Sequence, residues 1–329
     1  MKKKIALVTG GFTGESVVSL KSAAVVETQI DRERYDVYKI IIEKENWFYA
    51  AEDGTPSLVD LNDFSIQVDG KKVTFDGVFN ILHGSPGEDG KLAGYFDMVG
   101  LPYTTCDALT SAITMNKGYT KAIVQDIEGL EVANSLQLFK NSPKNTQRVI
   151  DELTLPYFVK PNNGGSSIGM SKVKSEGEVQ EALDKAFAED NQVLIEEFVS
   201  GREFSIGMYM VNGEVIVLPA TEIVSSKEFF DFEAKYTAGV TEEITPGRMS
   251  EEEVNRVREV ARKVYLKLNC KGAVRMDYFL EKETGKIFFI EINTVPGQTE
   301  TSLISQQVRA IGKTVKEFYT EIIEEMWKQ

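Results

Sequence analysis

The chain is poor in the residues that mark several common classes of protein. It has two cysteines, Cys106 and Cys270, and a single histidine, His83, in 329 residues. Two cysteines so far apart in sequence provide neither a disulfide framework nor a zinc site. No apolar run is long enough to span a membrane, and the run that follows the basic opening is too short for a signal peptide. We therefore expect a protein of the reducing cytoplasm that does not associate with membranes.

Positive charge is also scarce. The 37 lysines and arginines face 51 aspartates and glutamates, which gives a net charge of −14. This excess of negative charge argues against a general nucleic-acid-binding protein, and any anionic ligand needs a local cluster of lysine and arginine. The length and the 42% hydrophobic content are typical of a globular protein with two or three domains.

The first hundred residues alternate between short apolar strands and helices. We expect strands at residues 4–9, 35–43 and 73–82, and helices at residues 16–30 and 89–98. The spacing of apolar residues in the first helix predicts an inward face made of Val17, Leu20, Ala24 and Val25. The alternation predicts an open, parallel α/β sheet, with ligands at the carboxyl ends of its strands.

Two glycine-rich loops, residues 10–15 and 83–90, leave those strand ends. The first does not fit the G-x-G-x-x-G pattern of dinucleotide-binding proteins, which argues against a Rossmann-type oxidoreductase. Its Glu15 adds negative charge at a helix start, where it suits an ammonium group better than a phosphate. His83 opens the second loop, and the sequence leaves a binding role and a structural role equally open.

Beyond residue 105 the pattern changes to helices and hairpins. We expect helices at residues 107–127, with Lys117 and Lys121 inside it, and at 142–153, 176–190, 251–268 and 315–327. Apolar spacing predicts the inner faces of the last two helices: Val254, Val257, Val260, Ala261, Val264 and Leu268 in the first, and Phe318, Tyr319, Ile322, Ile323 and Met326 in the second. We expect strands at residues 155–160, 193–199, 204–211 and 214–219, the last two joined by the turn Asn212-Gly213. Ser142 and Pro143 form a good helix start, as cap and first-turn proline. Residues 226–239 have no clear period and are predicted to form a lid-like loop.

A loop rich in glycine and serine, residues 162–169, follows Lys160 at the end of a strand. Such a loop between two strands presents backbone N–H groups to an anion. It is not a P-loop, because no G-K-[ST] follows and no helix starts from it. A flexible hairpin tip is the alternative, but the lysine at the base favours phosphate binding.

Residues 272–303 predict two strands that carry a polar cluster. Arg275 and Asp277 share one face of the first strand, and Glu291 and Asn293 share one face of the second. A three-residue loop at 283–285 would place Asp277 opposite Glu291 and Arg275 opposite Asn293, whereas a loop of two or four residues would separate them. Two carboxylates and an amide oxygen are hard ligands, which suit Mg²⁺ shared with a substrate phosphate.

The alternative for this hairpin is an ordinary, half-exposed polar face without a ligand. In the register set by the three-residue loop, Phe279, Ile287 and Phe289 also lie on that face. Carboxylates in an apolar surround are costly unless a cation lies between them. The hairpin therefore favours metal and phosphate binding over the alternative.

Seven stretches then stand out in chain order: GGFTGESVVS, LHGSPGEDGKLAGYFDMVGLPYT, MNKGYTK, VKPNNGGSSIGMSKV, IEEFVSGREFS, FFDFEAKYTAG, and GAVRMDYF with FIEINTVPGQTETSL. Together they resemble the D-alanine–D-alanine ligase family, which has the ATP-grasp fold. The resemblance covers nearly the whole chain. It implies an N-terminal open parallel α/β domain (residues 1–105), followed by a two-lobed ATP-grasp region (residues 106–200 and 201–329).

The resemblance also implies a role for individual residues. The predicted ATP-binding residues are Lys117, Lys160, Gly165, Ser166, Ser167, Glu196, Glu197, Val199, Glu203, Lys235 and Asn293. The predicted ligands of two Mg²⁺ ions, or of Mn²⁺ in their place, are Asp277, Glu291 and Asn293. The predicted substrate-binding residues are Glu15, His83, Arg275, Gly297 and Ser302. The predicted catalytic residues are Glu15, Ser166, Arg275 and Tyr236.

Within these sets the implied roles differ. Lys117 and Lys160 would hold ATP phosphates, and Glu196 and Val199 would lie at the adenine. Glu203 would bind the ribose. Glu15 would bind the ammonium group of the first alanine, with His83 near its carboxylate. Ser302 and the Gly297 backbone would hold the carboxylate of the second alanine.

The implied function is the joining of two D-alanines, with ATP, through an acyl phosphate, in the synthesis of peptidoglycan precursors. The implied assembly is a homodimer. Two alternatives stay open: a ligase of the same fold that uses D-lactate or another second substrate, and a nucleotide-binding regulatory protein without catalysis. Tyr236 favours the alanine form by resemblance, and the joint presence of Arg275, Asp277, Glu291 and Asn293 argues against the regulatory form.

Overall fold

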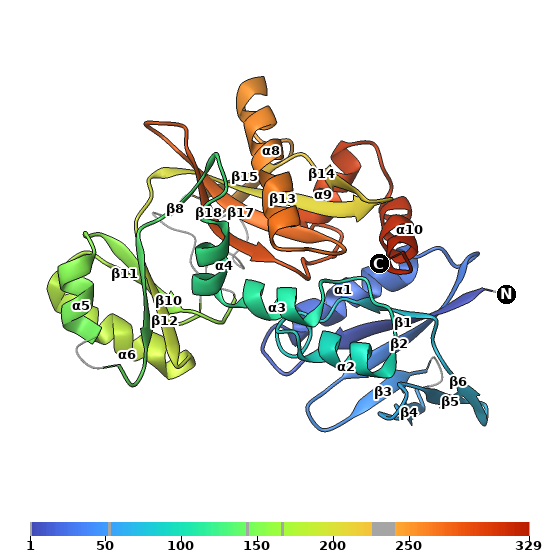
Figure 1. Cartoon of the computed structure of the whole chain (residues 1–329). Coiled ribbons are helices and arrows are strands. Elements are labelled where there is room, and N and C mark those ends of the chain that lie inside the picture. Colours follow the sequence, from blue (N-terminus) through green and yellow to red (C-terminus); the bar gives the residue numbers. More distant parts are fainter. Residues whose placement is uncertain (1, 52–53, 143–144, 166–167, 226–240, 329) are drawn as a thin grey trace.

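The computed structural model describes residues 2–51, 54–142, 145–165, 168–225 and 241–328 (Figure 1). Four predicted site residues lie outside these ranges: Ser166, Ser167, Lys235 and Tyr236. The predicted lid at residues 226–239 and Pro143 also lie outside them. The described strands form four sheets, and Figure 1 shows the N-terminal part, in blue, and the green lobe at opposite ends of the molecule.

The N-terminal part is an open α/β sheet, as predicted, but it is mixed and not wholly parallel, because β2 pairs with β3 and β3 with β4 in antiparallel fashion. Its strand order is β4-β3-β2-β1-β7, and β1 pairs in parallel with both β2 and β7. The strands are β1 (Lys3–Gly10), β2 (Tyr35–Ile42), β3 (Trp47–Ala50), β4 (Pro56–Leu58) and β7 (Gly77–Asn80), with helices α1 (Ser16–Gln29) and α2 (Lys91–Val99). The predicted strand at residues 73–82 is wrong in extent: β6 (Lys71–Val73) pairs with β5 (Ile66–Val68) in a separate hairpin.

Helix α1 turns a different face inward from the one its apolar spacing predicts. Its buried residues are Ser19, Ser22, Ala23 and Val26, whereas Val17 is 56% exposed and Leu20 is 43% exposed. The buried serines have hydrogen-bond partners, and the Ser19 hydroxyl accepts from the backbone N–H of His83 at 2.9 Å. Small hydroxyl side chains let the helix lie close to the loops at the strand ends, which a count of apolar residues cannot detect.

The predicted helix at residues 107–127 is in fact two helices, α3 (Ala108–Met115) and α4 (Lys117–Val124). Asn116 between them has extended backbone angles, and its side chain accepts a hydrogen bond from Tyr119 N at 3.0 Å. An asparagine cap of this kind satisfies a free N–H at a helix start, so α4 begins anew at Lys117. The break directs Lys117 toward the glycine-rich loop.

The green lobe of Figure 1 is a four-stranded antiparallel sheet with order β11-β10-β12-β9. Its elements are β9 (Ser135–Phe139), α5 (Asn145–Glu152), β10 (Tyr157–Pro161), β11 (Ser171–Val173), the 3₁₀ turn η1 (Glu176–Glu178), α6 (Val179–Glu189) and β12 (Gln192–Glu197). Its own buried core joins side chains of this sheet to α5 and α6, with Val149, Leu183 and Val193 among them. The glycine-rich loop connects β10 to β11 at one end of the sheet.

The largest sheet has the order β16-β15-β13-β17-β18-β8, with β14 paired to β13. Its strands are β8 (Leu130–Val132), β13 (Gly201–Val211), β14 (Glu214–Val217), β15 (Thr221–Ser225), β16 (Thr241–Ile244), β17 (Val274–Glu281) and β18 (Ile287–Asn293). Val211 pairs with Glu214, which confirms the two-residue turn at Asn212-Gly213. Helix α8 (Glu251–Lys267) covers this sheet with Val257, Val260, Ala261 and Val264, as predicted.

The last helix fastens the N-terminal sheet to the largest sheet. Helix α10 (Val315–Met326) follows α9 (Leu303–Ala310), and it buries Phe318, Tyr319, Ile322, Ile323 and Met326, the residues predicted to face inward. Phe318 and Tyr319 share one core with Leu7 of β1 and Tyr209 of β13. Among the described helices, none is both long and apolar enough to span a bilayer. The three-part division of the chain at residues 105 and 200 stays a prediction.

Candidate active site

A cavity of about 1150 Å³ lies where the N-terminal sheet, the green lobe and the largest sheet meet. Every predicted site residue that the structure describes lines it. These residues are Glu15, His83, Lys117, Lys160, Gly165, Glu196, Glu197, Val199, Glu203, Arg275, Asp277, Glu291, Asn293, Gly297 and Ser302. Residues far apart in the sequence therefore form one site.

The β17–β18 hairpin places the polar cluster as predicted but by a different route. Asp277 lies opposite Glu291 and Arg275 lies opposite Asn293. The predicted three-residue loop is wrong, because Leu280 pairs with Ile287 and four residues, 282–285, connect the strands beyond the Glu281–Lys286 hydrogen bond. A β-bulge after Asp277 adds one residue to β18 and restores the register that a four-residue loop alone would break.

The same bulge changes the apolar surround of the cluster. Phe279 pairs with Phe288, and both line the cavity. Ile287 and Phe289, which were predicted to share the polar face, are each 2% exposed and belong to the core beneath the sheet, although Phe289 also borders the cavity. The bulge shifts the alternation of β18 by one residue, so Phe288 takes the place predicted for its two neighbours.

Each predicted metal ligand has a polar partner within the protein. The Arg275 guanidinium donates to both carboxylate oxygens of Asp277, at 2.9 and 2.7 Å. The Lys117 ammonium lies 3.2 Å from Glu291, and Asn293 Oδ1 accepts from Val295 N at 2.9 Å. Burial alone would lower the pKa of Arg275, but the charges of Asp277 and Glu291 raise it, so the guanidinium is charged.

The donor set can be compared with what a metal ion needs. Among the described residues, no group of three or more histidine, cysteine, aspartate or glutamate side chains is arranged as a metal site. Asp277, Glu291 and Asn293 nevertheless offer two carboxylates and one amide oxygen from facing positions, and Ser205 Oγ donates to Asp277 at 2.6 Å. This all-oxygen set fits Mg²⁺ or Mn²⁺ and does not fit zinc.

Glu15 lies against the backbone of two glycine loops. A Cβ atom at Gly165 would come within 2.7 Å of Glu15 Oε1, and one at Gly84 would come within 2.8 Å of Glu15 Oε2. Gly84 also has a φ of 68°, which side-chain-bearing residues rarely adopt. The first helix, the His83 loop and the glycine-rich loop thus converge on one carboxylate.

These contacts predict a difference between two neighbouring glycines. We expect Gly165→Ala to lower kcat/KM strongly, because its methyl group must displace the Glu15 carboxylate. Gly164→Ala is the matched control, since a Cβ there meets only Pro161 at the ordinary distance of 3.9 Å. Steady-state rates of phosphate release for the two variants check this. Equal losses in both would show that loop flexibility, and not the approach to Glu15, explains the effect.

His83 is held inside the protein by helix α1. It is 5% exposed, and its Nε2 lies 3.4 Å from Ser22 Oγ. Ser22 Oγ also accepts from Gln298 N at 3.1 Å, which links the histidine to the loop that precedes α9. Burial lowers the pKa of His83 to about 4, and a backbone hydrogen bond with Val295 opposes the shift only in part. His83 is therefore neutral at neutral pH, and its predicted contact with a carboxylate stays a prediction.

The low pKa of His83 predicts a loss of stability in acid. The unfolded chain binds a proton on His83 near pH 6.5 and the folded chain only near pH 4, so the contribution of His83 to the free energy of unfolding falls as the pH drops through this window. The full effect is about 3 kcal/mol. Urea unfolding between pH 7 and pH 4.5 measures it, with His83→Gln as the reference. If both proteins lose stability in parallel, another group is responsible.

Glu88 is a cavity residue that sequence reasoning missed. Burial and the charge of Glu15 raise its pKa to about 8, while backbone N–H groups of Gly84 and Val295 lower it. The effect of Glu88 on the pH dependence of the free energy of unfolding is opposite to that of His83. The folded chain holds a proton on Glu88 between pH 4.5 and about 8, so this contribution to stability is lost as the pH rises. The signal in the sequence was its position in the loop that His83 opens.

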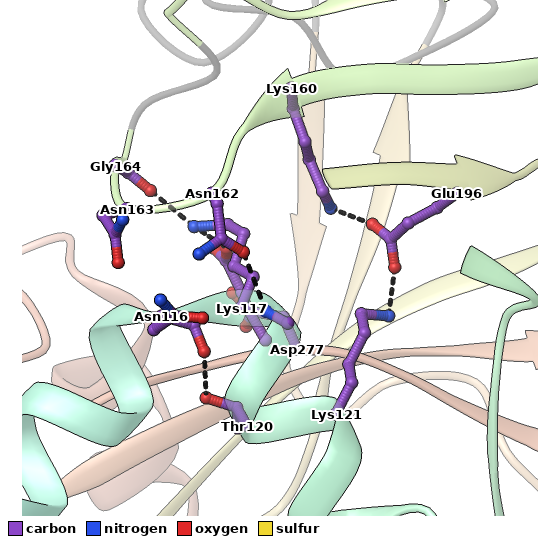
Figure 2. Close-up of polar contacts among 12 residues, drawn as sticks. Asn116, Lys117, Thr120, Lys121, Lys160, Asn162, Asn163, Gly164, Glu196 and Asp277 are labelled. Atoms are coloured by element: carbon purple, nitrogen blue, oxygen red, sulfur yellow. Dashed lines mark hydrogen bonds and ion pairs between the residues drawn. The ribbon is translucent and has the colours of Figure 1, made fainter. Parts of the chain in front are cut away.

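A buried amide network joins α4 to the glycine-rich loop (Figure 2). Gln192 Oε1 accepts from Asn116 Nδ2 at 3.0 Å and from Asn162 Nδ2 at 3.2 Å. Asn162 Oδ1 in turn accepts from the backbone of α4, and the Lys117 ammonium donates to Gly164 O. The network sets the first turn of α4 beneath the glycine-rich loop, so Lys117 and the loop form one wall of the cavity.

Glu196 lies between two lysines, as Figure 2 shows. One carboxylate oxygen contacts Lys121 of α4 and the other contacts Lys160 of β10. Burial alone would raise the pKa of Glu196, but the two lysine charges outweigh it and lower the pKa to about 2. Lys121 was noted in the sequence only as a lysine within a helix, and its four-residue distance from Lys117 was the available signal.

The remaining predicted residues lie on two sides of the cavity. Glu197 Oε1 accepts from Asn134 Nδ2 at 3.1 Å and from Thr154 N at 2.7 Å, so its side chain braces the start of β10. At the other end, the Ser302 hydroxyl accepts from Thr299 N at 2.9 Å, directly beside Gly297. The cavity thus extends from the green lobe to the start of α9.

The chain was then compared with known proteins. Two family models match: the D-ala D-ala ligase N-terminus over residues 4–106 and the D-ala D-ala ligase C-terminus over residues 124–324. The chain is 44% identical to the D-alanine–D-alanine ligase of Parabacteroides distasonis, over all of this chain and 98% of that protein. It is 40% identical to the one of Porphyromonas gingivalis, over 98% of both.

Solved structures agree with these relatives. The VanG D-Ala:D-Ser ligase of Enterococcus faecalis matches with a TM-score of 0.89 and 31% identity, over 99% of this chain and all of that chain. The D-alanyl-alanine synthetase A of Vibrio cholerae matches with a TM-score of 0.89 and 27% identity, over all of this chain and 99% of that chain. The chain belongs to the D-alanine–D-alanine ligase family and has its ATP-grasp fold.

Proposed function

We propose that this chain joins two D-alanine molecules to D-alanyl-D-alanine at the expense of ATP, for peptidoglycan precursor synthesis. The observation that carries the proposal is the single cavity in which lysines, an arginine and a carboxylate cluster meet. In a chain with a net charge of −14, a local cluster of cations is what the binding of an anionic ligand requires. The full-length relatives named D-alanine–D-alanine ligase support the same substrates.

The reaction requires the activation of a carboxylate, which is a poor acyl donor. A carboxylate oxygen of the first D-alanine attacks the γ-phosphorus of ATP, and the products are an acyl phosphate and ADP. The neutral amine of the second D-alanine then attacks the acyl carbon, and phosphate leaves. Lys117, Lys160 and Arg275 would neutralise the transferring group, and positioned charges supply most of what phosphoryl transfer needs.

Glu15 and the loop before α9 would orient the two alanines. The Glu15 carboxylate would bind the first ammonium group where α1 meets both glycine loops. The Gly297 backbone and Ser302 would bind the second carboxylate. Ser166, Ser167 and Lys235 keep their predicted role in binding ATP, and Ser166 and Tyr236 keep their predicted catalytic role. The site must exclude water, because an acyl phosphate hydrolyses readily.

Asp277, Glu291 and Asn293 would hold Mg²⁺, or Mn²⁺ in its place. When bound, the ions supply positive charge to the ATP phosphates. Arg275 contacts Asp277 and Lys117 contacts Glu291, and both cations would turn to the substrate phosphates once the metal binds. Glu203 on β13 and Glu196 with Val199 at the end of β12 would hold the ribose and the adenine.

Phosphate release from ATP tests the proposal directly. We expect release that depends on D-alanine, and a dipeptide product in a molar ratio of one to the phosphate. The absence of release with any amino acid or hydroxy acid would favour the nucleotide-binding regulatory protein. A cytoplasmic location, a homodimer and the absence of nucleic-acid binding stay predictions, and sedimentation analysis of the purified chain tests the dimer.

A ligase with a different second substrate is the second candidate. The observation in its favour is the match to the VanG D-Ala:D-Ser ligase at a TM-score of 0.89. Competition between D-alanine and D-serine or D-lactate for the second site decides between them. A product formed mainly from D-alanine and D-lactate, or from D-alanine and D-serine, would replace the leading proposal while keeping the ATP chemistry.

A further inference from the structure

The group formed by Lys121, Glu196 and Lys160 has more positive than negative charge and is almost completely enclosed. The three side chains are 5%, 9% and 14% exposed, respectively. Removing Glu196 would leave two buried cations without a counter-ion, whereas removing one lysine leaves the carboxylate with a single cation. A ligand can therefore draw one lysine away from Glu196 only while the other lysine stays as its counter-ion.

The two lysines differ in how firmly they are held. Lys121 rises from α4 and also donates to the backbone oxygen of Phe289 on β18 at 3.1 Å. It thus fastens α4 and the green lobe to the largest sheet. Lys160 hangs from β10, at the base of the glycine-rich loop, and reaches Glu196 from the opposite side (Figure 2). The contacts with Glu196 and Phe289 hold Lys121 in place, whereas Lys160 is placed to leave Glu196 for a ligand at the glycine-rich loop.

We propose that Lys121 is a positioning residue that serves as the permanent counter-ion of Glu196 and so releases Lys160 to bind nucleotide phosphate. The inference rests on the proposed function, because that function supplies the nucleotide. Without Lys121, the buried carboxylate would have Lys160 as its remaining cation and would hold it back from the phosphate. Lys121 touches no reacting atom, so its loss raises the KM for ATP more than it lowers kcat.

The test is ADP binding by calorimetry, which needs no ligation activity. We expect Lys121→Met to weaken ADP binding by about 10- to 100-fold, the effect of one charge-assisted contact. We expect the loss of ADP affinity caused by Lys121→Met to be smaller in a Glu196→Gln background than in the wild type, because a neutral amide no longer retains Lys160. Glu196→Gln alone supplies the reference for that background, since Glu196 also has a predicted role at the adenine. A role of Lys121 in packing alone predicts equal losses in both backgrounds.

Lys267→Met is the matched control, since Lys267, the last residue of α8, makes an exposed ion pair with Asp126. If Lys121→Met does not fold, Lys121→Gln keeps a donor for Phe289 O and removes only the charge. Lys121→Arg should restore most of the ADP affinity. Unchanged ADP affinity in folded Lys121→Gln overturns the inference. Failure of the proposed function appears separately, as a wild-type chain that binds ADP but makes no dipeptide.

Discussion

Glu291→Gln is expected to remove nearly all turnover while leaving the protein folded. The change replaces one carboxylate oxygen by an amide nitrogen and keeps the shape of the side chain, so packing on β18 is conserved. It removes the negative charge that faces Asp277 and lies 3.2 Å from Lys117. If this carboxylate holds the metal, kcat should fall by about 10²- to 10³-fold, as for the loss of other preorganised charge contacts.

The measurement is phosphate release at saturating ATP and D-alanine, with the melting temperature recorded in parallel. Glu283→Gln is the matched control, because Glu283 is an exposed residue in the turn of the same hairpin. Magnesium dependence gives a second readout, since the variant should need a higher Mg²⁺ concentration for half-maximal ADP binding. Activity near that of the wild type would reject the assignment of Glu291 as a metal ligand.

Arg275→Met is expected to damage both activity and stability. The guanidinium donates two hydrogen bonds to Asp277, which is itself 8% exposed. Without Arg275, the buried Asp277 carboxylate keeps the hydrogen bond from the Ser205 hydroxyl on β13 but loses its cation. Breaking such a buried pair costs about 3–5 kcal/mol. Turnover should also fall by about 10²-fold or more, because a cation predicted to face the transferring phosphate is lost.

The double variant Arg275→Met/Asp277→Asn separates the two effects. Without the Asp277 charge, most of the stability should return, because no buried charge is left unpaired. Activity should not return, since both the cation and a predicted metal ligand are then absent. Urea unfolding and phosphate release measure the two quantities. A double variant as unstable as the single one would show that Arg275 acts through packing and not through its pairing with Asp277.

Local signals were sufficient where the determining interactions are between neighbours in the chain. The inner face of α10 follows from its apolar spacing, because five apolar side chains face a single core. The turn Asn212-Gly213 follows from backbone preference alone, and Asn212 has the left-handed φ of 52° that such turns need. The same local signals failed on α1, where buried serines replace the apolar face and take hydrogen-bond partners from distant loops.

The cluster on the β17–β18 hairpin shows how a correct expectation can have an incorrect basis. The facing of Asp277 and Glu291 was predicted from a three-residue loop, but it arises from a longer loop and a bulge whose effects on the register cancel. Bulges leave little trace in a single sequence, because they depend on how the strand twists against its neighbours in the sheet. The side on which Phe288 and Phe289 lie depended on the same feature.

The sequence by itself determined which chemical groups this protein has available: a phosphate-binding loop with its lysine, an acid suited to an ammonium group, and oxygen ligands two residues apart on strands. These follow from residue type and from the fixed periods of helices and strands. Only the tertiary structure decided which groups share a charge. The pairing of Glu196 with Lys121 as well as Lys160, and of Arg275 with Asp277, joins separate elements or depends on burial. Electrostatic energy depends on distance and on exclusion of water, and both are set only when the lobes come together.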